Sequence, residues 1–172
     1  VDALIIRTFD HNNVIDLAFQ ADVPVINALS DLLHPCQALA DYYTIFEYRG
    51  KLQGLKIAYV GDGNNVARSL MYGAVKIGMD ISLGCPKNYF PNNYVVEKAL
   101  EDANHSKSKV LITEDPFEAV KDADVIYTDV WASMGQESER NQRLKIFQPY
   151  QINRKLADNA KPDALIMHCL PA

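Results

Sequence analysis

The sequence of 172 residues predicts an α/β protein built on an open, doubly wound parallel sheet. Three observations lead to this prediction. Short apolar runs of four or five residues recur along the chain, amphipathic stretches separate them, and Gly, Pro or Asn marks many of the junctions. Strands that alternate with helices in this way pair in parallel, because each helix returns the chain to the end of the sheet where the previous strand began. The expected fold class is therefore Rossmann-like.

The first third of the chain predicts two strands and two helices. Ala3–Ile6 and Val25–Leu29 are short, mostly apolar runs typical of strands. Between them, His11–Ala21 predicts a helix with the apolar residues Val14, Leu17 and Ala18 on one face. A second helix is expected from Pro35 to about Tyr48, where apolar residues again recur at helical spacing, and Gly50 can end it in a left-handed conformation.

The rest of the chain predicts five strands with helices between them. Each strand is a short apolar run, at Lys56–Val60, Asp80–Leu83, Val110–Thr113, Val125–Thr128 and Ala164–Met167. The stretches between them have helical periodicity, at Asn65–Ile77, Asn93–Ala103, Pro116–Ala123 and part of Leu144–Leu156. Gly78 ends one helix, and Asp115 precedes another as its N-cap. Five strands are enough for a complete open sheet.

The strands fall into two groups of unequal size. Residues 1–33 hold only a strand–helix–strand unit, which is too small to stand alone, so we expect it to be the end of one α/β domain. We expect a connecting helix over residues 34–53 and a second α/β domain over residues 54–172, incomplete at its carboxyl end. The chain begins inside a strand pattern without Met and stops directly after another strand, which indicates a fragment.

Composition and charge exclude several classes of function. Lys and Arg total 17 against 22 Asp and Glu, a net charge of −5, and there is no basic run to attract nucleic acid or an anionic membrane. No apolar stretch reaches the roughly 18 residues needed to span a bilayer. The cysteines, Cys36, Cys85 and Cys169, lie far apart and form no CxxC pair, which argues against a disulfide scaffold and a zinc site. We expect a reducing, cytoplasmic compartment.

Four short segments carry side chains suited to ligand binding, at the places where this fold builds its sites. The first is Gly61-Asp-Gly-Asn-Asn65, whose glycines allow a tight turn that brings helix amides to a negative group. As a dinucleotide fingerprint it fails, because Val66 stands at the third glycine position and no acidic residue follows the next strand. The tandem Asn64 and Asn65 suit a small carboxylate or amide, with an ordinary tight turn as the alternative.

The second segment is Asp129-Val-Trp-Ala-Ser133-Met-Gly135, directly after a predicted strand. A carboxylate there suits a substrate ammonium group, while Ser133 and the backbone amides before Gly135 suit a carboxylate, so that together they would bind an amino acid. A local Asx-turn at Asp129 is the alternative. The polar run from Gln136 to Arg143 is typical of a mobile surface loop and is a candidate lid.

The third segment, His34-Pro-Cys-Gln37, opens the connecting helix. His34 and Gln37 lie one turn apart, where they could polarise a carbonyl oxygen and hold an amide nitrogen. Proline in the first turn is also expected for helix capping alone, so a purely structural role is the alternative.

The fourth segment, His168-Cys-Leu-Pro171, follows the last strand. A thiol there could contact substrate, and Leu170-Pro171 requires an extended backbone. Alternatively, Cys169 is a small buried hydrophobe. Arg7, at the end of the first strand, is a further candidate anion ligand, with an ordinary surface arginine as its alternative.

In this order the four segments resemble the ornithine carbamoyltransferases. The resemblance covers essentially the whole chain, as the back part of that family's carbamoyl-phosphate domain and most of its ornithine domain. The pattern Asp-x-x-x-Ser-Met-Gly at 129–135 is the specific one. It separates these enzymes from the aspartate carbamoyltransferases, which share the His-Pro-x-Gln segment but have a different amino-acid loop.

The resemblance implies a role for each candidate residue. Carbamoyl phosphate would be bound by Arg7, His34 and Gln37. Ornithine would be held by Asn65, Asp129, Ser133 and Met134, and the point where the substrates meet would be lined by Cys169 and Leu170. The implied catalytic residues are Cys169, His34 and Asp129. The resemblance further implies a trimer for the complete protein, and the reaction needs no metal or redox cofactor.

The implied reaction carries the carbamoyl group to the side-chain amine of ornithine and gives citrulline and phosphate. The family's Ser-x-Arg-Thr phosphate loop and a further arginine near its carboxyl terminus are not among these residues. We therefore expect the 172-residue chain alone to be inactive or nearly so. Two other interpretations stay open: a carbamoyltransferase for putrescine or an acylated ornithine, and a non-catalytic module that binds an amino acid or a nucleotide.

Overall fold

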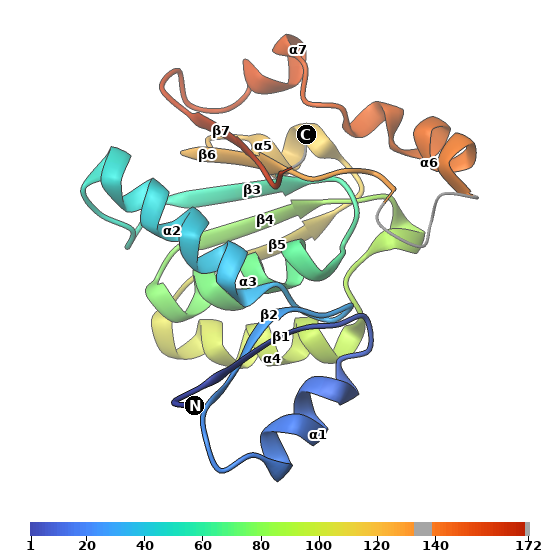
Figure 1. The fold of residues 1–172 in the computed structure, drawn as a ribbon. Coiled ribbons are helices and arrows are strands. Elements are labelled where there is room, and N and C mark those ends of the chain that lie inside the picture. The colour runs from blue at the N-terminus through green and yellow to red at the C-terminus, as the bar shows by residue number, and fades with distance from the viewer. Residues whose placement is uncertain (133–138, 171–172) are drawn as a thin grey trace.

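The computed structural model of the protein describes residues 1–132 and 139–170. Its fold contains two parallel sheets, one of five strands with helices on both faces and one of two strands (Figure 1). The small sheet consists of β1 (Leu4–Arg7) and β2 (Val25–Leu29), which α1 (Asn12–Gln20) connects. Helix α2 (Pro35–Arg49) then leads to the large sheet.

The large sheet and its helices account for the rest of the described chain. Its strands are β3 (Lys56–Val60), β4 (Asp80–Gly84), β5 (Val110–Thr113), β6 (Val125–Thr128) and β7 (Leu165–His168). Its helices are α3 (Asn65–Ile77), α4 (Asn93–Ser106), α5 (Pro116–Val120), α6 (Arg140–Phe147) and α7 (Arg154–Ala157). Two short 3₁₀ helices are η1 (Lys87–Tyr89) and η3 (Gln148–Tyr150). In the part of the chain that the structure describes, no helix has the length and apolar character of a membrane span.

The strand order of the large sheet is β5-β4-β3-β6-β7, and every pair is parallel. From β3 the chain moves outward through β4 to β5, then crosses to the other side of β3 and continues to β7. The helix connections that leave β3 and β6 therefore run to opposite sides, and a crevice opens between the loops that follow these two strands. The predicted doubly wound parallel fold is confirmed.

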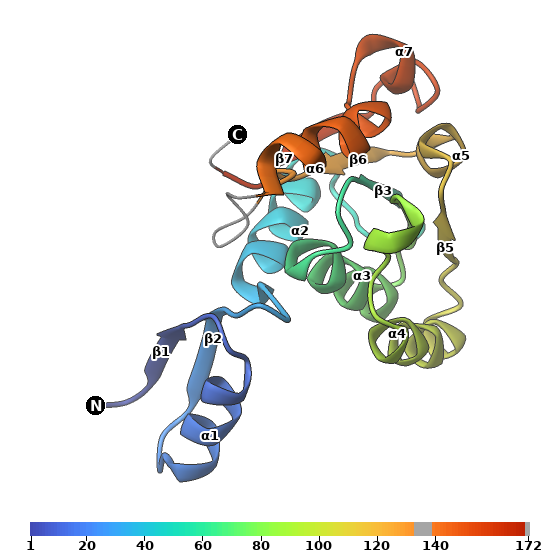
Figure 2. The ribbon, with the colours of Figure 1, turned by 90° about the vertical axis from the view of Figure 1, so that its right-hand side faces the viewer.

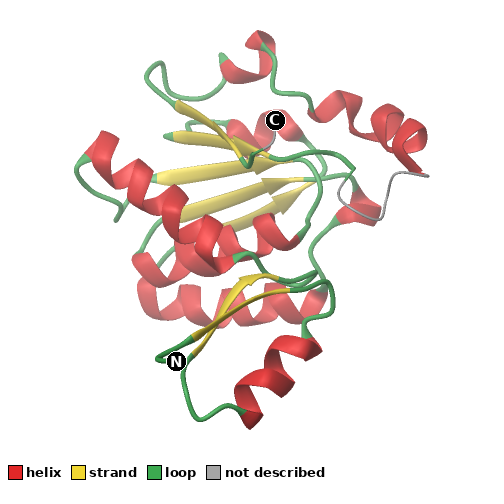
Figure 3. Ribbon diagram, in the orientation of Figure 1, coloured by secondary structure: helices red, strands yellow, loops and turns green. Residues whose placement is uncertain are grey.

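Helices cover both faces of the large sheet (Figure 3). A hydrophobic core holds them to the sheet on each face. On one face, α2, α3 and α4 pack against strand side chains that include Ile57 and Tyr59. On the other face, α5 and α6 pack against Ala58 and Val60, with Phe147 fully buried among them. Successive residues of β3 alternate between the two cores because side chains in a strand point to opposite faces. This two-sided burial explains why the strands are nearly continuous apolar runs in the sequence.

The small sheet projects away from the large one and meets it at the start of α2 (Figure 2). Its strands are less buried, with Ile5 73% and Ile26 42% exposed. On α1, Val14 is the buried residue and Phe19 is 91% exposed. The small sheet therefore has only a limited core of its own within the described residues.

Helix α2 is attached to the large sheet unit at both ends. Before its first turn, the backbone N–H of His34 donates to Ser69 Oγ of α3 at 2.7 Å. Further along, the Tyr42 hydroxyl donates to a backbone carbonyl of α3. At its end, Arg49 forms an ion pair with Asp163, just before β7, at 2.5 Å. These contacts make α2 part of the large unit rather than a free connector.

Most elements lie where the sequence predicts them, and the differences concern their ends. Helix α5 ends at Val120 rather than at Ala123, because Lys121 has a non-helical ψ of 124° and Asp122 then adopts a positive φ of 57°, which a right-handed helix does not accommodate. Of the predicted surface loop and candidate lid from Gln136 to Arg143, residues 136–138 lie outside the described residues, and the prediction is wrong from Arg140 onward. Residues 140–147 form α6, and Arg143 is only 4% exposed. A charged residue on the buried side of a helix hides the periodicity on which the prediction depends.

Gly73 on α3 packs directly against Tyr42 of α2. A Cβ atom at this position would lie 2.2 Å from Cε2 of Tyr42. We expect Gly73→Ala to lower the free energy of unfolding by about 1–3 kcal/mol through overpacking, although alanine favours a helix by about 1 kcal/mol. Urea denaturation followed by circular dichroism measures the change. A gain in stability would contradict the close packing of the two helices.

Candidate functional site

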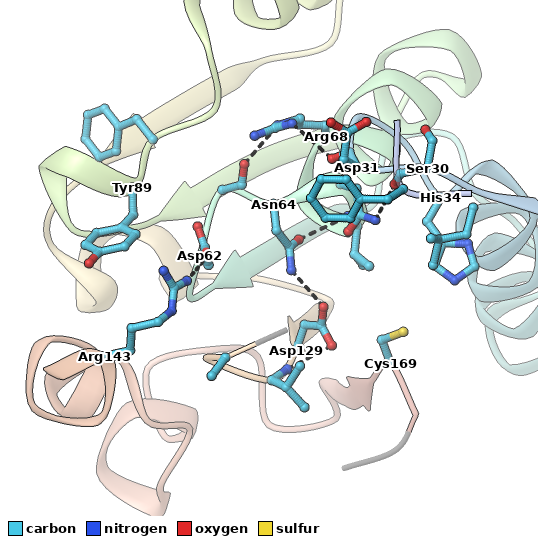
Figure 4. Close-up of a pocket in the computed structure, with 18 of the residues that line it drawn as sticks. Ser30, Asp31, His34, Asp62, Asn64, Arg68, Tyr89, Asp129, Arg143 and Cys169 are labelled. Atoms are coloured by element: carbon cyan, nitrogen blue, oxygen red, sulfur yellow. Dashed lines mark hydrogen bonds and ion pairs between the residues drawn. The ribbon is translucent and has the colours of Figure 1, made fainter. Parts of the chain in front are cut away.

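A cavity of about 580 Å³ opens at the carboxyl edge of the large sheet, beside the neighbouring strands β3 and β6 where the strand order changes direction. Its lining includes Ser30 and His34 from the segment between β2 and α2 (Figure 4). Asn65, Asp129 and Cys169 line it from the ends of β3, β6 and β7. The cavity therefore lies between the large sheet and the segment that leads in from the small one.

Asp129 follows β6 directly and is 7% exposed. Its Oδ2 accepts a hydrogen bond from Asn64 Nδ2 at 2.8 Å, and its Oδ1 accepts one from the backbone N–H of Val130 at 2.8 Å. Burial raises the pKa of Asp129, and these two hydrogen bonds oppose the shift. The bond to Val130 reaches one residue along the chain, not the two of an Asx-turn. The two hydrogen bonds offset only part of the cost of burying this carboxylate, so the cavity is well suited to a cationic ligand that would pair with it.

The two asparagines of the β3–α3 loop have different roles. Asn64 is the N-cap of α3, its Oδ1 accepting from two backbone N–H groups at 3.0 and 3.1 Å, and its Nδ2 reaches Asp129. Asn65 lines the cavity and donates from Nδ2 to the carbonyl of Ser30 at 2.7 Å. Asn64 thus orients the carboxylate, while Asn65 connects two walls of the cavity.

His34 lines the cavity just before the first turn of α2. Burial, and then the positive charge of Arg7, lower the pKa of its imidazole, so the ring is neutral at pH 7. Arg7 is exposed and lies outside the cavity lining, although its charge also acts on Cys169. A neutral imidazole can donate one hydrogen bond without adding a charge to the site.

Cys169 follows β7 and presents its side chain to the cavity while only 7% exposed. Burial raises the pKa of this thiol to about 11, and the charges of Asp129 and Asp41 add to the shift. At pH 7 the group is therefore a neutral, weakly polar wall and not a thiolate nucleophile. Leu170 lines the same cavity and is 79% exposed.

The structure brings together part of the predicted set of site residues. Those that line the cavity are His34, Asn65, Asp129, Cys169 and Leu170. Gln37 does not line it and instead donates from Nε2 to Asp41 Oδ1 at 3.0 Å. Ser133 and Met134 lie outside the described residues.

An ion pair that the sequence did not predict, with a buried arginine and a largely buried aspartate, forms another wall of the cavity. Arg143 of α6 pairs with Asp62 of the β3–α3 loop (Figure 4). The Arg143 guanidinium lies 4.9 Å from the ring centroid of Tyr89 and 5.2 Å from that of Phe147. Burial raises the pKa of Asp62, and Arg143 opposes the shift. Only the position of Asp62 inside the Gly-Asp-Gly segment pointed to this wall in the sequence.

The fold and the cavity together define a class of protein. The sheet is open and parallel, and the point where its strand order changes direction holds a buried carboxylate, amide side chains and a neutral imidazole. This arrangement is typical of proteins that bind small polar molecules. Within residues 1–132 and 139–170, no three His, Cys, Asp or Glu side chains are grouped to hold a metal ion.

Two family models match the chain. The aspartate/ornithine carbamoyltransferase Asp/Orn binding domain matches residues 53–172, and the carbamoyl-P binding domain of the same family matches residues 1–47. The chain belongs to the aspartate/ornithine carbamoyltransferase family. The resemblance seen in its four sequence segments is thereby confirmed.

Individual relatives support the same assignment. The ornithine carbamoyltransferases of Bacillus subtilis and Anoxybacillus flavithermus are 58% and 56% identical over the whole chain, which covers 54% and 55% of their lengths. The solved structure of ornithine carbamoyltransferase from Pyrococcus furiosus is 56% identical, with a TM-score of 0.95 over all of this chain and 55% of that one. The chain thus spans about half the length of the relatives it matches.

Replacing Arg143 tests the buried ion pair. Arg143→Met leaves the Asp62 carboxylate buried without its cation, so we expect the free energy of unfolding at pH 7 to fall by about 3–5 kcal/mol. The loss of Arg143 raises the pKa of Asp62 further, so this deficit should shrink as the pH falls and Asp62 takes up a proton. Urea denaturation at neutral and acidic pH measures both effects.

Arg140→Met is the matched control, because Arg140 is exposed on the same helix. It should leave stability nearly unchanged. Equal losses in the two variants, or a loss independent of pH, would contradict the role given to the pair.

Proposed function

We propose that the chain is part of a longer ornithine carbamoyltransferase. The enzyme would transfer the carbamoyl group of carbamoyl phosphate to the side-chain amine of L-ornithine and release L-citrulline and phosphate. The observation that carries this proposal is the convergence of His34, Asp129 and Cys169 on one cavity at the edge of the parallel sheet. The names of the relatives at 56% and 58% identity support it.

Recognition of ornithine follows from the charges around this cavity. Ornithine carries an α-ammonium, an α-carboxylate and a side-chain amine, so it needs both an anion and hydrogen-bond donors. We place the α-ammonium against Asp129, whose carboxylate Asn64 holds in position at 2.8 Å. Asn65 contributes an amide from the neighbouring loop. By the family resemblance, Ser133 and Met134 complete the site for the amino acid.

Recognition of carbamoyl phosphate falls to the other wall. His34 donates a hydrogen bond to the carbamoyl oxygen as a neutral imidazole. Gln37, one turn further along α2, holds the carbamoyl nitrogen. Arg7 lies outside the cavity lining, and its positive charge would attract the phosphate, just as it lowers the pKa of His34.

The chemistry requires a neutral amine. In water the side-chain amine of ornithine has a pKa near that of lysine, about 10.4. Beside the uncharged Cys169 thiol and Leu170, a charged amine is poorly solvated, which favours its neutral form. The amine nitrogen then bonds to the carbamoyl carbon, and the bond from that carbon to the phosphate oxygen breaks. The nitrogen loses its extra proton to the departing phosphate.

We also propose how the chain is organised in the complete protein. Residues 1–33 would end the carbamoyl-phosphate domain, residues 34–53 would connect it, and residues 54–172 would form most of the ornithine domain. The complete protein would be a cytoplasmic trimer. The free thiols of Cys36, Cys85 and Cys169 are in keeping with a reducing compartment.

An assay with several amines tests the proposed function. The complete protein should form citrulline from ornithine and carbamoyl phosphate, and it should carbamoylate neither putrescine nor acetylornithine. The 172-residue chain alone should be inactive or nearly so, because each missing hydrogen bond to the phosphate dianion is worth about 1.5–3 kcal/mol. Colorimetric detection of the ureido product measures all arms. Preference for another amine would reject ornithine as the substrate.

Replacing Asp129 tests the binding of the amino acid. Asp129→Asn in the complete protein should lower kcat/KM for ornithine about a hundredfold, since a charged hydrogen-bond partner is lost. The KM for carbamoyl phosphate should change little, because that substrate binds the opposite wall. Asp16→Asn, at an exposed position on α1, is the control. Equal effects on both substrates would argue that Asp129 acts on the structure and not on ornithine.

A further inference from the structure

A buried polar cluster lies next to the cavity, between α2 and the large sheet. It contains Gln37 and Asp41 of α2 and Tyr127 of β6. Asp41 is only 4% exposed, and Gln37 Nε2 donates to its Oδ1 at 3.0 Å. Neither the sequence segments nor the cavity lining includes Asp41, so the function proposed above leaves this buried carboxyl group unexplained.

The cluster is continuous with the site through the periodicity of α2. Residues 34, 37 and 41 are spaced by three and four positions, which places them on one face of a helix. His34, at the start of this face, lines the cavity. Gln37 therefore stands between a cavity residue and the buried Asp41.

Asp41 is also enclosed from the side of the sheet. The Tyr127 hydroxyl is its neighbour on β6, two residues before Asp129. Among the described residues, Asp41 Oδ2 and the Tyr127 hydroxyl have no partner in full hydrogen-bond geometry. The charge of Asp129 and the thiol of Cys169 face the same cluster. Asp41 thus has one firm hydrogen bond, and that bond goes to Gln37.

Burying the Asp41 carboxyl group costs free energy, and an apolar side chain could fill the same position without that cost. Burial raises the pKa of Asp41, and the neighbouring Tyr127 hydroxyl and Gln37 amide only oppose that shift. An apolar side chain at a buried helix position is often neutral or stabilising relative to a buried charge. The carboxyl group therefore calls for a reason other than stability.

The geometry supplies that reason through the two ends of the Gln37 carboxamide. A carboxamide can present either its oxygen, which accepts, or its NH₂, which donates. Asp41 Oδ1 accepts whether the carboxyl group is ionised or carries its proton on Oδ2. Opposite this acceptor the NH₂ end of Gln37 is fixed, which leaves the oxygen end available as an acceptor.

We propose that Asp41 is a positioning residue that turns the Gln37 carboxamide so that its oxygen accepts a hydrogen bond from the carbamoyl nitrogen. This inference rests on the proposed function, in which Gln37 holds that nitrogen. Without Asp41, the carboxamide is free to rotate, and its NH₂ end would face the NH₂ of the substrate, donor against donor. The attachment of α2 to the large unit at both ends keeps the pair in register.

The test compares two replacements of Asp41 in the complete protein. Asp41→Leu removes the acceptor but keeps the position filled, so KM for carbamoyl phosphate should rise about tenfold while Tm is unchanged or higher. Asp41→Asn restores an acceptor oxygen and should stay close to wild type. Glu47→Leu, an exposed acid on the same helix, is the control. A merely structural Asp41 would lower Tm in Asp41→Leu and leave KM unchanged.

A double-variant cycle separates positioning from a general disturbance. In a Gln37→Ala background, Asp41→Leu should have no further effect on KM, because its only route to the substrate is gone. If the tenfold rise persists in that background, the proposal is wrong. Wild-type protein that forms no citrulline would overturn the proposed function itself, whereas active wild type with Asp41→Leu matching the control would overturn only the positioning role.

A second pair of variants keeps the test decisive if Asp41→Leu fails to fold. Gln37→Glu sets two carboxyl groups against each other and should weaken carbamoyl-phosphate binding strongly. Adding Asp41→Asn supplies an NH₂ donor to the new carboxylate and leaves its second oxygen for the carbamoyl nitrogen. The double variant should recover about tenfold of the lost affinity. No recovery would overturn the proposal.

Discussion

The strand order of the large sheet, in which the chain adds strands on one side of β3 and then on the other, is the constraint on which the site depends. It brings the loops after β3 and β6 face to face, and the hydrogen bond from Asn64 Nδ2 to Asp129 Oδ2 joins them. Asn64 also caps α3, so one side chain ties the helix, the loop and the carboxylate together. Because backbone amides already occupy its oxygen, the amide group can only point its NH₂ at Asp129. The orientation of the buried acid is thus set by the same residue that begins the helix.

The fold could be predicted from the sequence because a parallel sheet buried on both faces has strands that are nearly continuous apolar runs. Residues 56–60, 110–113 and 125–128 form strands with the predicted bounds, and Gly50 and Gly78 end their helices at φ of 69° and 78°. These features depend on neighbours along the chain. At the end of α5 the apolar pattern continues past the point where the backbone leaves the helix before Asp122, so the helix was predicted three residues too long.

The site was predictable only where its residues follow a strand or open a helix. Asp129, Asn65 and Cys169 stand at such places, and the sheet topology then brings them to one cavity. Arg143 and Asp62 are 81 positions apart, and their pairing leaves no local pattern. Asp41 was missed for a related reason. A polar residue on the apolar face of α2 only interrupts the helical apolar pattern, and its role becomes visible once its hydrogen bond with Gln37 is known.

The attachment of α2 at both ends also decides which contacts join the two units. Because α2 belongs to the large unit, residues 30–33 are the covalent link from the small sheet to it. This link is itself tied to α3, since Asn65 Nδ2 donates to the Ser30 carbonyl and Arg68 donates to the Asp31 carbonyl. The cavity wall that Ser30 provides is therefore held by the helix that Asn64 begins, so a single helix end supports both walls.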